Sequence, residues 1–200
     1  MSIVIDKNLF TLHTRSATYQ MKADQWGTLL HLYYGERTDS SDKSYFVQQN
    51  DVGFSGNPYE AGQTTRRYSL DTLPQEYSCF GTGDYRTTAL RTRNPDGSQA
   101  AGLRFHSYEQ LPGKYSITGL PALYAQEGQG ETLVLRMEDS ASGLVVELYY
   151  GVLEEQDVIT RAVRIVNRGT EAVTLEKAAS MQLDRQWGQF AWISLYGRHS

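Results

Sequence analysis

Apolar and polar residues alternate with a period of two along much of this chain. The pattern is clearest over residues 132–139 and 143–151. One face of these two segments carries Leu133, Leu135, Met137, Leu144, Val146, Leu148 and Tyr150. Alternation of this kind places one side of a β-strand on a core and the other side toward solvent or a second layer. Residues 19–35 repeat the pattern on both sides of a turn at 24–27, so they predict two further strands.

Turn-forming residues stand between several of the predicted strands. Residues 94–97 (NPDG) and 167–170 (NRGT) each predict a hairpin between the strands on either side, and 140–143 (SASG) joins the two clearest strands. In the first of these turns proline presets φ, and glycine takes the left-handed position that closes the loop. Such joints at short spacing predict an all-β fold, a sandwich of antiparallel sheets.

Three segments depart from the strand pattern. Residues 73–77 (LPQEY) follow Asp71 and Thr72, which supply a cap, and they predict a short helical piece. Residues 36–66 are polar, and a loop of this length is usually either functional or disordered. Residues 192–200 (WISLYGRHS) have strand-like alternation without a closing signal, which predicts that the sandwich is truncated at its C-terminal end.

Composition narrows the class of protein. Two hundred residues, 40% of them hydrophobic and 21% charged, suffice for one globular domain with a core. The net charge of −4 is interspersed, without the basic patch that nucleic-acid binding requires. The start lacks a secretory pattern, no stretch is apolar enough to span a bilayer, and the single Cys79 excludes an intrachain disulfide. We therefore expect a cytoplasmic protein that binds neither nucleic acid nor membrane.

Local motifs for catalysis by metals, cofactors or nucleophiles are missing from the sequence. The four histidines, His13, His31, His106 and His199, are scattered singly, which favours packing or hydrogen-bonding roles over metal ligation. No G-x-S-x-G elbow or phosphate-binding glycine loop occurs, so we expect no cofactor. Glycoside hydrolysis needs two suitably spaced carboxyl groups, and the sequence alone selects no pair. The candidates are Asp51, Asp71, Glu76, Asp84, Glu154, Glu155 and Asp157.

Two stretches are dense in side chains that bind sugars: the first comprises 50–62 followed by 66–86, and the second is the aromatic terminus, 187–199. Asp and Asn bind vicinal hydroxyls, Arg adds a forked donor, and aromatic rings offer apolar faces. A structural alternative stays open for four of these residues, in which ion pairs tie the long loop to the sandwich. These four are Arg66, Arg67, Asp71 and Glu76.

The same stretches resemble the N-terminal region of bacterial family 36 α-galactosidases (melibiases). The resemblance runs in order through FSGNPYEAG, YSLDTLPQEYS, GTGDYR, LPGKYSITGLPALY, GVLEEQDVITRAVRIVN and the terminal YGRH. It implies that residues 1–200 form an incomplete N-terminal β-supersandwich of the galactose-mutarotase-like type. The catalytic (β/α)₈ barrel, with its aspartate nucleophile and aspartate acid/base, would lie outside this chain, so the chain itself holds no catalytic residue.

The resemblance also implies a function and partners. The parent enzyme would hydrolyse terminal α-D-galactosyl residues with retention, on raffinose-family oligosaccharides and melibiose. The domain would contact its own catalytic barrel and take part in a homo-oligomer, a dimer or a tetramer. Asp51, which precedes FSGNP, and Tyr196, where some relatives have tryptophan, would contribute to the substrate pocket. Two other functions remain open: a non-catalytic carbohydrate-binding module, and a purely structural or oligomerisation domain.

Overall fold

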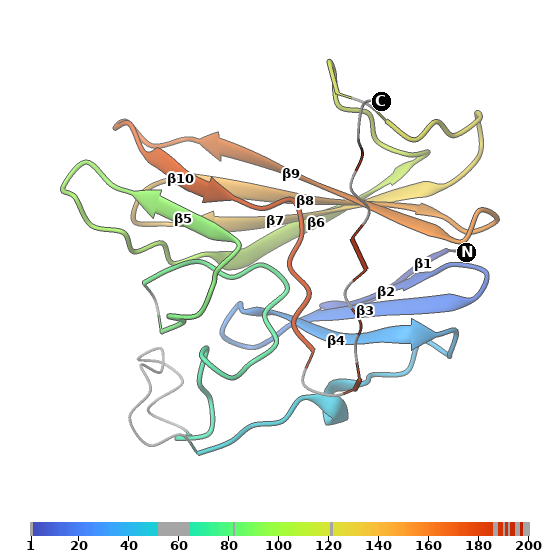
Figure 1. Ribbon diagram of the computed structural model, residues 1–200, viewed down its shortest axis with the longest axis horizontal. Coiled ribbons are helices and arrows are strands. Elements are labelled where there is room, and N and C mark those ends of the chain that lie inside the picture. Colours follow the sequence, from blue (N-terminus) through green and yellow to red (C-terminus); the bar gives the residue numbers. More distant parts are fainter. Residues whose placement is uncertain are drawn as a thin grey trace.

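Two four-stranded antiparallel sheets pack face to face in the computed structural model (Figure 1). It describes residues 2–51, 65–81, 83–120 and 122–185, together with 188–189, 191, 193–194 and 197. The first sheet contains, in spatial order, β1 (Ile3–Asp6), β2 (Leu9–His13), β3 (Ala17–Ala23) and β4 (Leu29–Glu36). The second contains β6 (Arg104–Pro112), β7 (Glu131–Asp139), β8 (Leu144–Leu153) and β9 (Val158–Asn167). The predicted all-β antiparallel sandwich is therefore confirmed.

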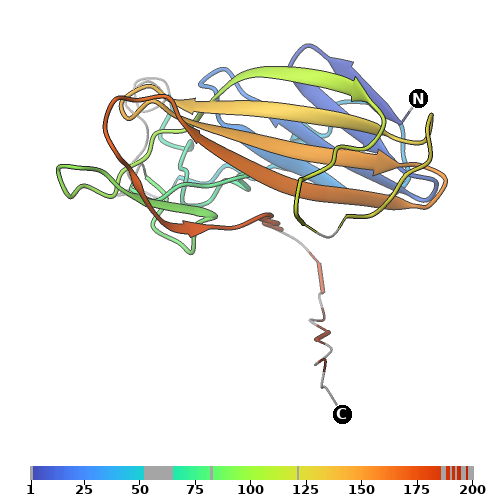
Figure 2. The same cartoon turned by 90° about the horizontal axis from the view of Figure 1, so that it is seen from above.

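A two-stranded ladder extends the sandwich at one end. It pairs β5 (Leu90–Arg93) with β10 (Thr174–Ala178), and Figure 2 shows it beside the larger sheets. Among the described residues the one helical element is a short 3₁₀ turn, η1 (Ser44–Phe46). No helix in that part of the chain is long and apolar enough to cross a membrane.

The main core lies between the two sheets and confirms the predicted faces. All seven apolar residues of the predicted inner face in β7 and β8 belong to it, and each is at most 3% exposed. From the opposite sheet, Phe10, Leu12 and Met21 contribute fully buried side chains. The outer face of the second sheet carries a polar cluster, in which Glu147 of β8 accepts from Arg136 of β7 and from Arg164 of β9. The period-two pattern therefore assigned both faces correctly.

Two predicted hairpins are wrong in their pairing. The chain does reverse at 94–97, where the Gly97 amide donates to the Asn94 carbonyl at 2.9 Å. However, β5 pairs with β10 and β6 pairs with β7, so neither strand pairs with its predicted neighbour. Likewise, β9 pairs with β8 and not with β10. Turn residues fix where a chain reverses, but the burial of strand faces decides which strands pair.

The predicted short helix at 73–77 is also wrong. Pro74 accepts a hydrogen bond from the His31 amide at 2.7 Å, and the Glu76 amide donates to Leu29 at 2.9 Å. The segment therefore runs along the edge of β4. Pairing there satisfies the backbone and fully buries Leu73 and Glu76, which a single exposed helical turn does not achieve.

Two glycines with left-handed φ angles offer a matched test of turn packing. Gly143 (φ 73°) lies in the β7–β8 turn, and a Cβ there would stand 2.8 Å from the Cα of Gly169. Gly97 (φ 86°) has nothing within 4 Å of that position. We expect Gly97→Ala to lower the free energy of unfolding by about 1–2 kcal/mol, the cost of a left-handed alanine. Gly143→Ala should lower the free energy of unfolding by a further ~1–3 kcal/mol, because the added methyl group overpacks the turn. Urea denaturation measures both, and equal losses would contradict the contact.

Candidate functional site

A pocket of about 210 Å³ opens at the edge of β4, beyond the point where residues 74–76 pair with that strand. Its lining comes from β4, from the end of η1 and the residue after it, and from two parts of the chain that follow later in the sequence. The lining residues are His31, Leu32, Tyr33, Tyr34, Phe46, Val47, Pro74, Asp184 and Arg185. Apolar and ionisable side chains therefore share one small space.

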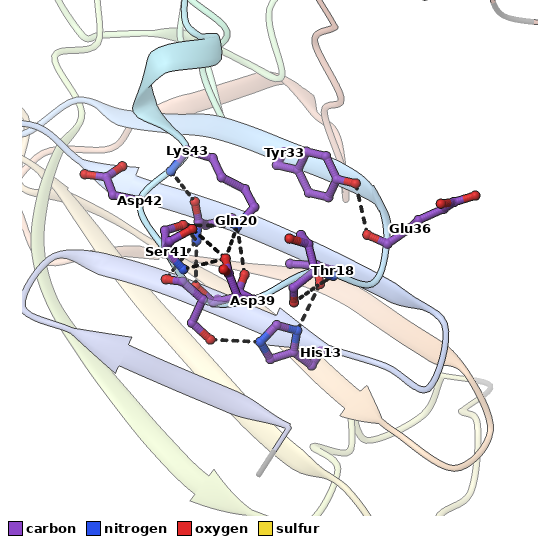
Figure 3. Close-up of polar contacts among 12 residues, drawn as sticks. His13, Thr18, Gln20, Tyr33, Glu36, Asp39, Ser41, Asp42 and Lys43 are labelled. Atoms are coloured by element: carbon purple, nitrogen blue, oxygen red, sulfur yellow. Dashed lines mark hydrogen bonds and ion pairs between the residues drawn. The ribbon is translucent and has the colours of Figure 1, made fainter.

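A polar strap, residues 37–43, crosses the outer face of the first sheet (Figure 3). In the chain it leads to Phe46 and Val47, which line this pocket. Lys43 is its buried anchor: its ammonium group donates to the carbonyls of Asp39 at 2.7 Å and Ser41 at 3.1 Å. Gln20 of β3 accepts from the Lys43 amide and donates to the Ser41 carbonyl, each at 3.0 Å. The strap is thus fixed to the sheet and positions the turn that carries Phe46 and Val47.

His13 of β2 holds the other part of the strap. Its Nδ1 lies 3.0 Å from the Thr18 hydroxyl and its Nε2 lies 2.9 Å from the Ser40 hydroxyl. Burial lowers the pKa of His13, and the nearby Arg37 lowers it further. His13 is therefore a packed, hydrogen-bonding histidine, which is the role that the sequence favoured.

A buried ion pair lies between the sheets. Glu76 is fully buried, and its carboxylate lies 2.8 Å from the guanidinium of Arg161 on β9. Tyr19 of β3 and Tyr150 of β8 donate their hydroxyls to the same carboxylate at 2.8 and 2.7 Å. Burial alone would raise the pKa of Glu76, but Arg161, His31 and the Tyr150 hydroxyl outweigh it and lower the pKa. The carboxylate therefore ties the 66–86 segment to both sheets.

The same arginine fixes the segment that precedes the chain's C-terminal stretch. Arg161 donates to the backbone carbonyl of Gln182 at 3.0 Å, and Gln182 donates to Asp184 Oδ2 at 2.9 Å. Arg86 lies 3.5 Å from that Asp184 oxygen. Burial raises the pKa of Asp184, although Arg86 opposes the shift. A continuous polar chain thus connects the core to the pocket.

Of the two predicted substrate-binding residues, the structure describes one. Asp51 follows the pocket-lining Val47 in the chain, its side chain is half exposed, and its carboxylate lies 3.6 Å from Arg66. Tyr196 lies outside the described residues, as do residues 52–64. The structural alternative holds for Glu76, which forms the buried ion pair, while Arg66 pairs within the loop with Asp51.

The roles of several residues of this site were not predicted from the sequence. Arg161 has a recognisable signal, because it interrupts the apolar inward positions of β9 that Ile159 and Val163 occupy. Asp184 has no recognisable signal in the sequence, since its role depends on a tertiary contact with Arg86. In the described part of the chain, no group of three or more His, Cys, Asp or Glu side chains is placed to hold a metal ion.

Comparison with known proteins identifies the family. The sequence profile described as the glycosyl hydrolase family 36 N-terminal domain matches residues 27–200. This chain belongs to that family. Its sequence is 53% identical over 98% of its length to the bifunctional α-galactosidase/sucrose kinase AgaSK of Mediterraneibacter gnavus, of which it spans 21%. It is 40% identical to α-galactosidase Mel36A of Lactobacillus acidophilus, of which it spans 27%.

Solved structures agree with the family 36 assignment. The galactosidase domain of AgaSK matches 90% of this chain with a TM-score of 0.86, and the chain covers 25% of it. A variant of the family 36 α-galactosidase AgaA from Geobacillus stearothermophilus, solved with raffinose, matches 88% of the chain at 35% identity with a TM-score of 0.82. The chain covers 24% of that structure. This family 36 domain therefore spans about a quarter of the relatives that it matches.

Proposed function

We propose that this chain is the N-terminal domain of an α-galactosidase that hydrolyses terminal α-D-galactosyl residues with retention of configuration. The observation that carries the proposal is the 53% identity to AgaSK over 98% of the chain, together with the close structural match to the AgaSK galactosidase domain. Relatives at 34–35% identity were solved with raffinose and stachyose, which supports raffinose-family oligosaccharides as substrates. The reactive carboxylates would belong to a barrel outside this chain.

Asp51 and Tyr196 would contribute contacts to the galactose end of the substrate pocket. Asp51 suits this role because its carboxylate is half exposed and Arg66, at 3.6 Å, is its ion-pair partner. A carboxylate in this state can accept hydrogen bonds from sugar hydroxyls without being removed from a buried network. The rival function is structural: Asp51 would order the loop through Arg66 and touch no substrate.

Asp51→Ala in the parent enzyme tests the proposal. Loss of one hydrogen bond to a sugar hydroxyl, about 0.5–1.5 kcal/mol, should lower kcat/KM for aryl α-galactosides roughly 2- to 13-fold. Arg66→Ala is the matched control, because it removes the ion pair but leaves the carboxylate. If the role is only structural, both variants should lower thermal stability equally and leave kcat/KM unchanged, and that result would remove Asp51 from the pocket.

The domain would also serve in assembly, as part of a cytoplasmic homo-oligomer, a dimer or a tetramer. Segment 113–125 carries Ile117, Leu120, Leu123 and Tyr124, whose exposed fractions run from 38% to 93%. Exposed apolar side chains gathered in one segment are typical of protein interfaces. The single Cys79 is buried and its thiol donates to the Ala101 carbonyl, so the chain has no intrachain disulfide, which suits a reducing compartment.

A further inference from the structure

We propose that the pocket at the edge of β4 is itself a binding site for one hexopyranose, with His31 and Asp184 binding its hydroxyls. The proposal rests on the proposed carbohydrate function only for the choice of galactose as the first ligand to test. At about 210 Å³ the pocket is smaller than the 300–1,000 Å³ typical of sites for drug-sized ligands, so it suits a single ring.

His31 supplies a buried polar group at the pocket. The residue is 5% exposed and lines the pocket, and its Nδ1 faces the Glu76 carboxylate in an ion-pair contact at 3.4 Å. Within the described chain that nitrogen has no hydrogen-bond partner. Because the two ring nitrogens lie on opposite sides of the imidazole, a ring whose Nδ1 faces Glu76 turns its Nε2 side away from the ion pair. A ligand hydroxyl can therefore pair with the Nε2 side of the imidazole, while the Nδ1 side faces Glu76.

Asp184 supplies a directed acceptor. Gln182 donates to its Oδ2 at 2.9 Å, and Arg86 lies 3.5 Å from the same oxygen. Both contacts orient the carboxylate through one oxygen, which leaves Oδ1 to accept from a ligand. The side chain is 30% exposed, so a ligand can reach it. A carboxylate whose orientation is fixed through one oxygen, with the other oxygen available to a ligand, is well suited to accept a hydrogen bond from a sugar hydroxyl.

The rest of the lining is mostly apolar. Leu32, Phe46, Val47 and Pro74 form it, and Tyr34 adds a ring over which the Arg185 guanidinium lies at 5.2 Å. A pyranose ring also combines polar and apolar surface, because its hydroxyls lie at the edge of the ring and its C–H groups lie on the faces. The division between the apolar residues and the His31–Asp184 pair therefore matches a sugar.

Other ligand classes fit this lining less well. An anion would meet the Asp184 carboxylate, whose repulsion Arg185 would have to offset. A divalent cation requires more oxygen ligands than one carboxylate provides. A wholly apolar ligand would cover the Nε2 side of the His31 imidazole without offering it a hydrogen bond, which is costly. A neutral polyol satisfies both polar groups and covers the apolar wall.

Titration of the ¹⁵N-labelled 200-residue chain with D-galactose, followed by amide chemical shifts, tests the site. We expect saturable shifts at Phe46, Val47 and Asp184, and a Kd raised roughly 2- to 13-fold by Asp184→Asn or His31→Gln, the loss of one hydrogen bond. The matched controls are Asp96→Asn and His106→Gln, which replace an exposed aspartate and an exposed histidine outside the pocket lining and should leave Kd unchanged. Retained dispersion of the amide spectrum shows that each variant is folded.

Val47→Trp provides a second route, because it fills the pocket without touching the polar chain. It should abolish the shifts at Asp184. Absence of saturable shifts in the folded wild-type chain, or equal Kd values in the pocket variants and the controls, would overturn the site. Hydrolysis of α-galactosides by the parent enzyme is a separate readout, so failure of the proposed function and failure of this site are distinguishable.

Discussion

Replacing Arg161 by methionine is expected to lower the free energy of unfolding by about 3–5 kcal/mol, because it leaves a buried carboxylate without its partner. Glu76 is fully buried and Arg161 is 8% exposed, so solvent does not screen the loss. In the variant Tyr19 and Tyr150 still donate to the carboxylate and His31 still lies 3.4 Å from it, but none of them replaces the permanent charge of the guanidinium. Urea denaturation of both proteins measures the difference.

The double variant Arg161→Met/Glu76→Gln supplies the control. Removing the unpaired charge should recover part of the lost stability, and the double-mutant cycle isolates the interaction between the two side chains. Simple additivity of the two single losses would contradict a direct ion pair.

The same pair predicts a pH dependence. In the wild type the pKa of Glu76 is lowered below its ordinary 4.5, so its stabilisation is present above pH 4.5 and is lost as pH falls through the lower folded value. Without Arg161, burial raises that pKa, so the variant loses stability as pH rises through it. The stability gap between the two proteins should therefore narrow between pH 7 and about 4. A gap independent of pH would contradict the assignment.

Phe10→Ala is expected to lower the free energy of unfolding by about 3–5 kcal/mol, as large-to-small core changes do. Phe10 projects from β2 into the core, is fully buried, and packs its ring 5.6 Å from Phe105 and 5.4 Å from Tyr108 of the opposite sheet. Its removal opens a cavity between the two layers. The midpoint of urea unfolding measures the effect.

Tyr124→Ala is the matched control for Phe10, since it also removes an aromatic ring. Tyr124 is 93% exposed, and the change should stay within about 0.5 kcal/mol. Similar losses for the two variants would show that Phe10 does not join the sheets.

The fold was largely predictable because the alternation of apolar and polar residues shows which face of each strand is buried. The alternate residues from Leu133 to Met137 and from Leu144 to Tyr150 point to the core as their pattern requires. Strand partners were less predictable: the NPDG turn indicates a reversal at 94–97, yet β5 finds β10, whose residue Glu176 accepts from Arg93. That choice depends on contacts between distant parts of the chain, which no local pattern encodes.

The candidate site was predictable only in part. Family resemblance pointed to Asp51, and the ion-pair alternative pointed to Glu76, whose partner Arg161 occupies an inward position of β9. His31 resembled any isolated strand histidine, and only its position between Glu76 and the pocket gives it a distinct role. The role of a side chain that depends on its tertiary neighbours cannot be predicted from a single sequence.

The pairing of β5 with β10 also has a consequence for biosynthesis. Strands β1 to β4 form a meander of close neighbours, so their contacts become available soon after each strand leaves the ribosome. By contrast, β5 emerges before β6, β7, β8 and β9, and its partner follows all of them. Until β10 is translated, the edge of β5 stands open, and this nascent stretch is where a chaperone would protect the chain from wrong pairing.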